Sequence, residues 1–229
     1  MLAVFVNALT VIVGSILGLL FQKRLKEEYT KTIIACMGIC TMVIGITGAI
    51  ETSNSLIVIL CLVFGTILGE LFKLEKGMDN AGNWLKKKVP GSGGRFTEGF
   101  VTASLLFCVG SMTIMGSFES GLQGDHSIIF AKSAMDGIMA VTLSATMGLG
   151  VAFSALAVII YQGALTLLAG VVAPYLSDPV ITEMSAVGGV MLIATGMNII
   201  GLTKERIRVG NMLPALIFPV IWFAIAGLF

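Results

Sequence analysis

Long apolar stretches separated by short polar ones dominate the chain. About 20 consecutive apolar residues are needed for a helix to span the hydrocarbon core of a bilayer. The pattern predicts eight such spans, over residues 2–21, 32–51, 55–73, 97–118, 127–148, 151–173, 183–202 and 209–229. The apolar run from 137 to 177 is too long for one helix, and Gly148 and Gly150 predict the turn that divides it. The chain is therefore predicted to be an all-α integral membrane protein, with a single transmembrane domain over residues 1–229.

An internal repeat indicates how these spans are organised. Residues 14–22 match residues 65–73 at six of nine positions, and a basic segment follows both copies. This predicts duplicated two-helix units over about 1–51 and 52–118. Weaker similarities relate about 55–148 to about 151–229, and with three helices in each unit they predict an inverted repeat, an architecture that many secondary transporters share.

Both copies of the repeat contain glycines four residues apart, Gly14 with Gly18 and Gly65 with Gly69. In lipid, glycines at this spacing let two helix backbones approach closely. We therefore expect these four glycines to lie in helix contacts. Such faces also offer a route to a homo-oligomer.

The basic residues are concentrated in three of the connecting segments. Thirteen of the 14 Lys and Arg residues lie in segments 23–31, 73–95 and 204–208, which alternate with acidic connections that carry no basic residue. Cytoplasmic loops are enriched in Lys and Arg, so these three segments are predicted to be cytoplasmic and both termini to lie outside. The net charge of +1 says little, because charge is segregated by side.

Composition removes several classes of function. The chain is 56% hydrophobic and 12% charged, against about 25% charged in a typical soluble domain, and we expect no nucleic-acid partner. The four cysteines fall within predicted spans and lack CxxC spacing, and His126 is the one histidine. No metal site and no cofactor are expected. Because no nucleophile–base pair is visible, we do not expect an enzyme.

The fourteenth basic residue, Lys132, lies inside a predicted span, four residues before Asp136. One helical turn places the two side chains on the same face. A charge in the middle of a membrane helix costs roughly 2.5–3.5 kcal/mol on insertion scales, so such residues usually face the bundle interior and mark a functional site. The alternative is a self-neutralising pair near the helix end, with Lys132 extending to the interface.

Other polar residues within the spans favour a polar pathway around this pair. The Gly110–Ser117 segment has the composition of an unwound helix centre, which can expose backbone groups to an ion or solute. Alternatively, its hydroxyls bond to their own helix and its glycines pack. The amides elsewhere are individually typical of interhelical contacts, but together they favour a cavity. The predicted pathway residues are Lys132, Asp136, Ser111, Thr113, Ser117, Gln162, Thr195, Asn198, Asn211 and Pro214.

Four segments together resemble the YdfK/YqgA-like family of bacterial inner-membrane proteins. They are residues 14–21, residues 110–117, the Lys132-x-x-x-Asp136-Gly137 helix and residues 210–214. The resemblance implies a multi-pass protein of the bacterial cytoplasmic membrane with a role in transport. It supplies neither a substrate nor functional residues.

The sequence thus favours a secondary transporter or permease for a small polar or charged solute or ion, embedded in the lipid bilayer. The buried pair, the inverted repeat and the absence of an energising domain support this hypothesis. The alternative is a structural or regulatory membrane protein that oligomerises through its glycine faces and transports nothing.

Overall fold

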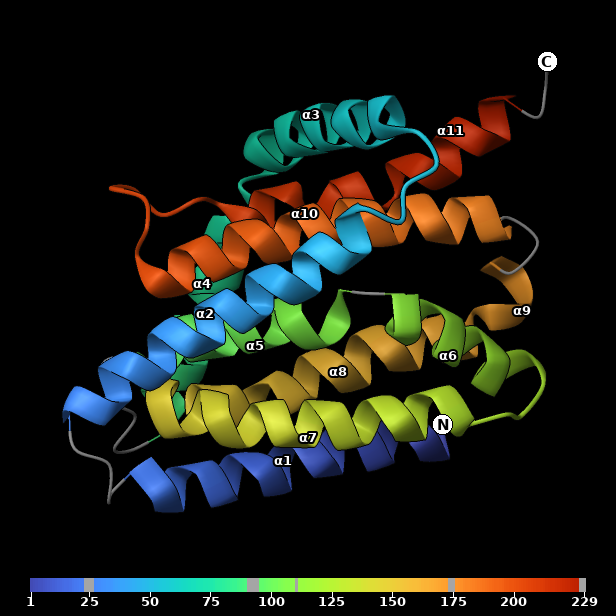
Figure 1. Cartoon of the computed structure of the whole chain (residues 1–229). Coiled ribbons are helices and arrows are strands. Elements are labelled where there is room, and N and C mark those ends of the chain that lie inside the picture. The colour runs from blue at the N-terminus through green and yellow to red at the C-terminus, as the bar shows by residue number, and fades with distance from the viewer. Residues whose placement is uncertain (23–26, 90–94, 110, 173–175, 227–229) are drawn as a thin grey trace. The chain divides into compact units, whose positions relative to one another are not determined.

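The computed structural model describes residues 1–22, 27–89, 95–109, 111–172 and 176–226, and these residues form helices and connections without any strand (Figure 1). Most of the helices follow the apolar stretches of the sequence. In chain order the elements are α1 (Leu2–Gln22), α2 (Glu27–Ala49), α3 (Ser55–Phe72), α4 (Leu74–Lys88), α5 (Phe96–Cys108), α6 (Ser111–Leu122), α7 (Ser127–Met147), α8 (Gly150–Leu167), α9 (Ala169–Val172), α10 (Asp178–Ile200), the 3-10 helix η2 (Val209–Leu216) and α11 (Phe218–Ala226).

The all-α membrane class is confirmed, but the count of eight spans is not. Within the described residues, six helices are long and apolar enough to cross a membrane: α1, α2, α3, α7, α8 and α10. A seventh span results if α5 and α6, bent by 60°, are counted as one. The predicted last span is instead η2 followed by the short α11. Pro214 lies inside η2, where its missing N–H and its ring oppose a regular α-helix.

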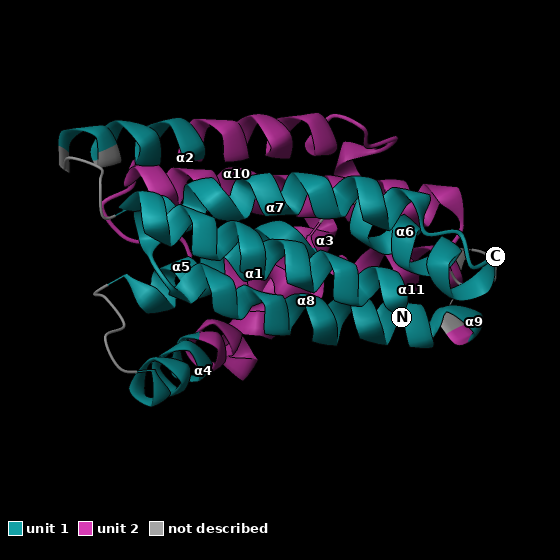
Figure 2. Cartoon of the chain, turned by 90° about the horizontal axis from the view of Figure 1, so that it is seen from below, with its two compact units in different colours: residues 1–37, 79–108, 112–170 teal, residues 38–78, 109–111, 171–229 magenta. Residues whose placement is uncertain are grey.

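By its internal contacts the chain divides into two compact units, coloured separately in Figure 2. Unit 1 comprises residues 1–37, 79–108 and 112–170, and unit 2 comprises residues 38–78, 109–111 and 171–229. The single domain and the inverted repeat remain predictions.

In unit 1, α1 lies along α7 with almost no space between the two backbones. A Cβ on Gly14 would overlap the carbonyl oxygen of Gly137, and a Cβ on Gly18 would overlap that of Val141. The residue numbers of the contacting positions increase together along the two helices, from Gly14 with Gly137 to Gly18 with Val141, so α1 and α7 run parallel. If α2 and α3 each cross the membrane once, α7 can start on the same side as α1 only when α5 and α6 make one crossing between them. On that condition, the helix break lies within a single bent span.

Helix α8 packs against α5 and α6 to complete unit 1. Its first residue, Gly150, lies against the carbonyl of Phe96 on α5. Toward the other end of α8, the carbonyl of Thr166 lies against Gly121 of α6.

In unit 2, the second copy of the repeat meets a different partner. Gly65 of α3 lies against the backbone of Ala215, and Gly69 lies against the carbonyl of Asn211, so α3 packs on η2. The same nine-residue motif therefore serves helix packing twice, once on a regular helix and once on a 3-10 helix.

The outward faces of the long helices are strongly apolar. On α1, for example, Phe5, Leu9 and Leu20 are each more than half exposed. Soluble monomers rarely expose contiguous apolar patches on this scale. A lipid environment accounts for this surface, in agreement with the membrane class.

Candidate functional site

The ion pair of α7 is present and buried. Lys132 Nζ lies 2.5 Å from Asp136 Oδ2, and the two side chains are 8% and 9% exposed. At ~1.5 Å per residue, Lys132 lies about 8 Å and Asp136 about 14 Å along the axis from the start of α7, so the carboxylate is near the middle of a helix long enough to cross a ~30 Å hydrocarbon core. The ammonium bonds to its own helix neighbour rather than extending to the interface.

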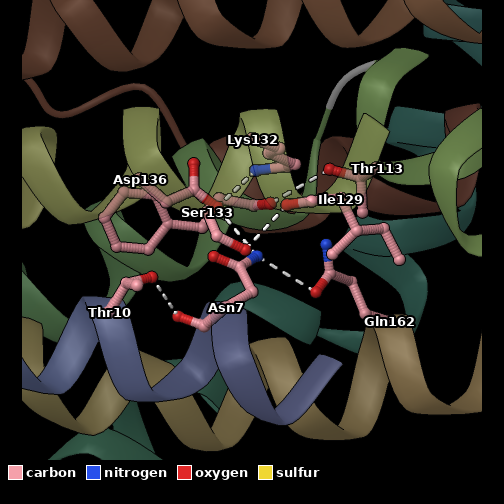
Figure 3. Close-up of polar contacts among 9 residues, drawn as sticks. Asn7, Thr10, Thr113, Ile129, Lys132, Ser133, Asp136 and Gln162 are labelled. Carbon is pink, nitrogen blue, oxygen red and sulfur yellow. Dashed lines mark hydrogen bonds and ion pairs between the residues drawn. The ribbon is translucent and has the colours of Figure 1, made fainter. Parts of the chain in front are cut away.

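A third residue, Asn7 of α1, joins the pair to α8. Its Nδ2 donates to Asp136 Oδ2 over 3.0 Å and to Gln162 Oε1 over 3.1 Å (Figure 3). Asn7 and Gln162 are both completely buried. The carboxylate oxygen Oδ2 therefore receives two donors, one charged and one neutral, and the network links three helices of unit 1.

Sequence analysis missed Asn7. It is the one amide in the first predicted span, and an isolated amide in an apolar segment was the available signal. Its partners lie 129 and 155 residues away, so no local pattern connects them.

At the break between α5 and α6, a side chain replaces a missing backbone hydrogen bond. Thr113 Oγ1 donates to the carbonyl oxygen of Phe107 over 3.1 Å, across six residues. A continuous helix would have satisfied that carbonyl with a backbone N–H, so the threonine compensates for a bond that the bend removes. Cys108, the last residue of α5, is within electrostatic range of both Lys132 and Asp136.

Several buried polar atoms around the network have no hydrogen-bond partner among the described residues. They include Asn7 Oδ1, Gln162 Nε2 and Ser117 Oγ. An unmade hydrogen bond of a buried group costs about 1–3 kcal/mol. Native proteins usually leave such groups unpaired only where a water, an ion or a function accounts for them.

The other predicted pathway residues divide by unit. The side chain of Ser111 lies outside the described part of the structure, and Thr113, Ser117 and Gln162 belong to unit 1 with the ion pair. The remaining four, in unit 2, are Thr195, Asn198, Asn211 and Pro214.

In unit 2 the side-chain bonds of these residues go to backbone groups. Thr195 Oγ1 donates to the carbonyl of Met191. Asn198 bonds both backbone groups of Ile207 at 2.8 Å, and Asn211 Oδ1 accepts the N–H of Glu75 at 2.7 Å. These amides therefore fix a connection and a helix start.

A buried carboxylate in unit 2 also escaped sequence analysis. Glu183 of α10 is 1% exposed and accepts bonds from Thr52 Oγ1 at 2.6 Å, Ser53 N at 2.9 Å and Asn54 N at 3.2 Å. It holds the connection between α2 and α3 against α10. Because Glu183 is at the edge of an apolar run, the sequence pattern treats it as the end of a span.

Outside the spans, two charged groups have shifted pKa values. Hydrogen bonds from the hydroxyl and N–H of Ser127 lower the pKa of the exposed Asp125 carboxyl at the start of α7. The bidentate contact with Glu98 raises the pKa of the Arg95 guanidinium. Both are local surface interactions away from the buried pair.

The helical fold, its lipid-facing surface and the buried network define a multi-pass α-helical membrane protein. The chain belongs to the family described as "Protein of unknown function (DUF554)", whose model matches residues 2–224. The predicted resemblance to YdfK/YqgA-like proteins is thereby confirmed.

Two relatives match nearly end to end. The chain is 32% identical over 217 residues to "Uncharacterized membrane protein YdfK" of Bacillus subtilis (strain 168), covering 93% of this chain and 91% of the relative. It is 31% identical over 233 residues to "Uncharacterized protein YqgA" of Escherichia coli (strain K12), covering 96% of this chain and 98% of the relative. No solved structure matches the chain.

Proposed function

We propose that the protein is a secondary transporter or permease for a small polar or charged solute or ion, with its site around Lys132 and Asp136. The observation that carries the proposal is the buried ion pair near the middle of a membrane helix, bonded to Asn7 and flanked by polar atoms that have no partner among the described residues. A pair that served stability alone needs no such unsatisfied surroundings.

The chemistry of the cluster suits a ligand that exchanges partners with it. The site presents a carboxylate, an ammonium and two amides to the same region, so it can bind either sign of charge or a hydroxyl group. A solute that displaces Lys132 from Asp136 would restore the charge balance through its own groups. The break in α5–α6 supports this role, because discontinuous helices line substrate sites in many transporters.

We further propose that the protein resides in the cytoplasmic membrane of a bacterium, with the described basic helix α4 inside and the connection between α6 and α7 outside. Single cysteines at Gln123 and Lys87, both in polar surface segments, test this orientation. An impermeant maleimide added to intact cells should label Gln123→Cys and spare Lys87→Cys. The reverse labelling pattern contradicts the orientation.

Ligand-dependent stabilisation is the experiment that tests transport. A panel of amino acids, carboxylates, sugars and inorganic ions is added to purified protein, and the thermal midpoint is measured. A ligand at 100 times its dissociation constant stabilises the folded state by about 2.7 kcal/mol. Compounds that raise the midpoint are then assayed for radiolabelled uptake into proteoliposomes, with Asp136→Asn and Lys132→Met as test variants and Glu98→Gln as the control variant.

We expect uptake with the wild type and with Glu98→Gln, and loss of uptake with both site variants. The proposal is wrong if stabilising compounds bind equally well to the two site variants, or if none of them crosses the membrane. Chemical cross-linking of a stable oligomer together with absent uptake would favour the structural or regulatory alternative.

A further inference from the structure

The second half of α4 carries basic and amide side chains at helical spacing. Residues 80–88 contain three lysines and no acidic residue. Positions 80, 83, 84 and 87 follow the spacing i, i+3, i+4 and i+7, which places them on one face of the helix. This face presents two amides, an indole and an ammonium group.

A shallow surface hollow of about 610 Å³ lies beside this face. Its lining consists of five side chains of α4, all within unit 1: Asn80, Asn83, Trp84, Lys86 and Lys87. The volume falls in the ~300–1,000 Å³ range of small-molecule sites. Each lining side chain has a hydrogen-bond donor and none is acidic, so the hollow suits an anion.

Two contacts hold side chains of the hollow in place. Thr97 Oγ1 donates to Asn83 Oδ1 over 2.9 Å, so this amide turns its oxygen toward α5. The ammonium of Lys88 lies 5.2 Å from the centre of the Trp84 ring, within the range of a cation–π interaction. Both the Asn83 amide and the indole are therefore oriented before any ligand binds.

The hollow lies at the level of the membrane surface. Helix α4 begins two residues after the end of α3, one of the helices that can cross the membrane. A Cβ on Gly82 would lie 2.8 Å from Thr97 Cγ2, so α4 packs on the first turn of α5, where the bent α5–α6 pair begins. Trp84 is 58% exposed, and tryptophans are enriched at the headgroup level of membrane proteins.

We propose that this hollow binds the phosphate group of an anionic phospholipid. Lys86 and Lys87 supply positive charge, and the two amides and the indole N–H donate to the phosphate oxygens. In the proposed orientation the lipid belongs to the cytoplasmic leaflet. Lysines in a last turn also stabilise a helix through its dipole, and any basic surface attracts anionic lipid diffusely, but neither effect involves the amides.

Trp84 itself reports the bound lipid. The chain has two tryptophans, and Trp222→Phe leaves Trp84 as the fluorophore. The full chain is reconstituted into phosphatidylcholine vesicles that contain a minor fraction of phosphatidylglycerol. Bromine atoms are placed on the acyl chains of the phosphatidylglycerol, or on an equal amount of the phosphatidylcholine. Bromine quenches tryptophan on contact, so the ratio of the two quenching efficiencies measures the preference for the anionic lipid.

We expect brominated phosphatidylglycerol to quench Trp84 more strongly than brominated phosphatidylcholine. In the matched control Trp84→Phe, the remaining Trp222 on α11, which does not line the hollow, should be quenched equally by both lipids. Both leaflets of the vesicle have the same composition, so the measurement does not depend on the orientation of the protein.

Three variants in the Trp222→Phe background separate a built site from diffuse attraction. Lys87→Gln should lower the preference by about fivefold. Lys76→Gln removes the same charge from α4 about 16 Å away along the helix axis, at ~1.5 Å per residue, and should change the preference little. Asn80→Ala changes no charge and should lower the preference by at least about twofold, because a donor to the phosphate is lost.

Four results overturn the site: equal quenching of Trp84 by the two lipids, an equal loss of preference in Lys87→Gln and Lys76→Gln, an unchanged preference in Asn80→Ala, or loss of the preference when inorganic phosphate replaces chloride at equal ionic strength. The last result assigns the hollow to free phosphate. Circular dichroism and gel filtration confirm that each variant folds. No step requires solute uptake, so the lipid site and the proposed transport function fail separately.

Discussion

Replacement of Asp136 by Asn should destabilise the protein strongly, because it leaves the Lys132 ammonium buried without its anion. The substitution keeps the size of the side chain and retains an oxygen that can accept the bond from Asn7. What changes is the charge next to Nζ, at a distance of 2.5 Å. The experiment therefore isolates the electrostatic part of the network.

The magnitude follows from burial. Both side chains of the pair are less than one-tenth exposed, so water screens the charges little. Removing one partner of a buried pair typically costs about 3–5 kcal/mol, most of it from the charge left behind. By contrast, the Arg95–Glu98 pair is about one-third exposed on each side, and a surface pair contributes only about 0–1 kcal/mol.

The assay is reversible unfolding in mixed micelles, followed by circular dichroism, for the wild type, Asp136→Asn and Glu98→Gln. We expect the loss of unfolding free energy in Asp136→Asn to exceed that in Glu98→Gln by at least about 2 kcal/mol. Swapping the charges, Lys132→Asp with Asp136→Lys, should recover most of the stability. Under the proposed function the swapped protein still fails to transport, since the solute then meets the charges in the opposite order.

Two results refute this reasoning. If Asp136→Asn is as stable as Glu98→Gln, the Lys132 ammonium is not held in a low-dielectric site. If the swapped protein transports as well as the wild type, the pair is a structural salt bridge only.

Three further predictions concern other parts of the chain. Gly69→Ala should lose about 1–3 kcal/mol or more of stability, because its Cβ would overlap a backbone carbonyl. Gly77→Ala, where the Cβ meets open space, should gain about 0.5–1 kcal/mol. Thermal unfolding compares the two variants, and equal effects contradict the packing of Gly69. Ser127→Ala should raise the lowered pKa of Asp125, which carbon-13 NMR of the carboxyl group measures. In the wild type the Ser127 contact contributes stability above the unfolded-state pKa of Asp125, and this contribution is lost as the pH falls through the folded-state pKa. An unchanged pKa of Asp125 in the variant contradicts this cause. Gln at positions 86–88, in the basic last turn of α4, should weaken binding of anionic lipid by about 1 kcal/mol per lysine, because these lysines attract anionic headgroups at the membrane surface. Native mass spectrometry counts the retained lipids. Equal retention of anionic and zwitterionic lipid by the wild type contradicts this attraction.

Much of the fold could be predicted because each span is a local property. A run of apolar residues bounded by polar ones gave α1, α3 and α7 to within about one residue at each end. For residues 110–117, the Gly, Ser and Thr content left two interpretations open, an unwound centre and a packed regular helix, so the bend between α5 and α6 was not decided by the sequence. The last span was predicted as one long helix but consists of the 3-10 helix η2 and the short α11, since hydropathy does not distinguish a 3-10 helix with an internal proline from an α-helix.

The candidate site was predicted in part for the same reason. Lys132 and Asp136 pair within one helical turn, so their spacing alone indicates the contact. Asn7 donates to Asp136 across 129 residues, and a single sequence contains no pattern that reports such a contact. Equally, nothing local separates Gln162, which joins the network, from Asn198, which bonds to a loop backbone.

The separation of Asn7 from its partners has a consequence for the biosynthesis of the protein. The pair within α7 can neutralise itself as soon as that helix forms, because both charges lie on one turn. The amide of α1 leaves the ribosome 129 residues before Asp136 and 155 before Gln162. At about 5–20 residues per second, about 8–31 s pass between synthesis of Asn7 and of Gln162, and α1 is in or near the membrane during that time. During that time its polar side chain needs a temporary partner, such as water at the insertion site or another polar group of the insertion machinery. The network can therefore be completed only after α8 has been inserted, and truncation of the chain before α8 should leave α1 available for degradation.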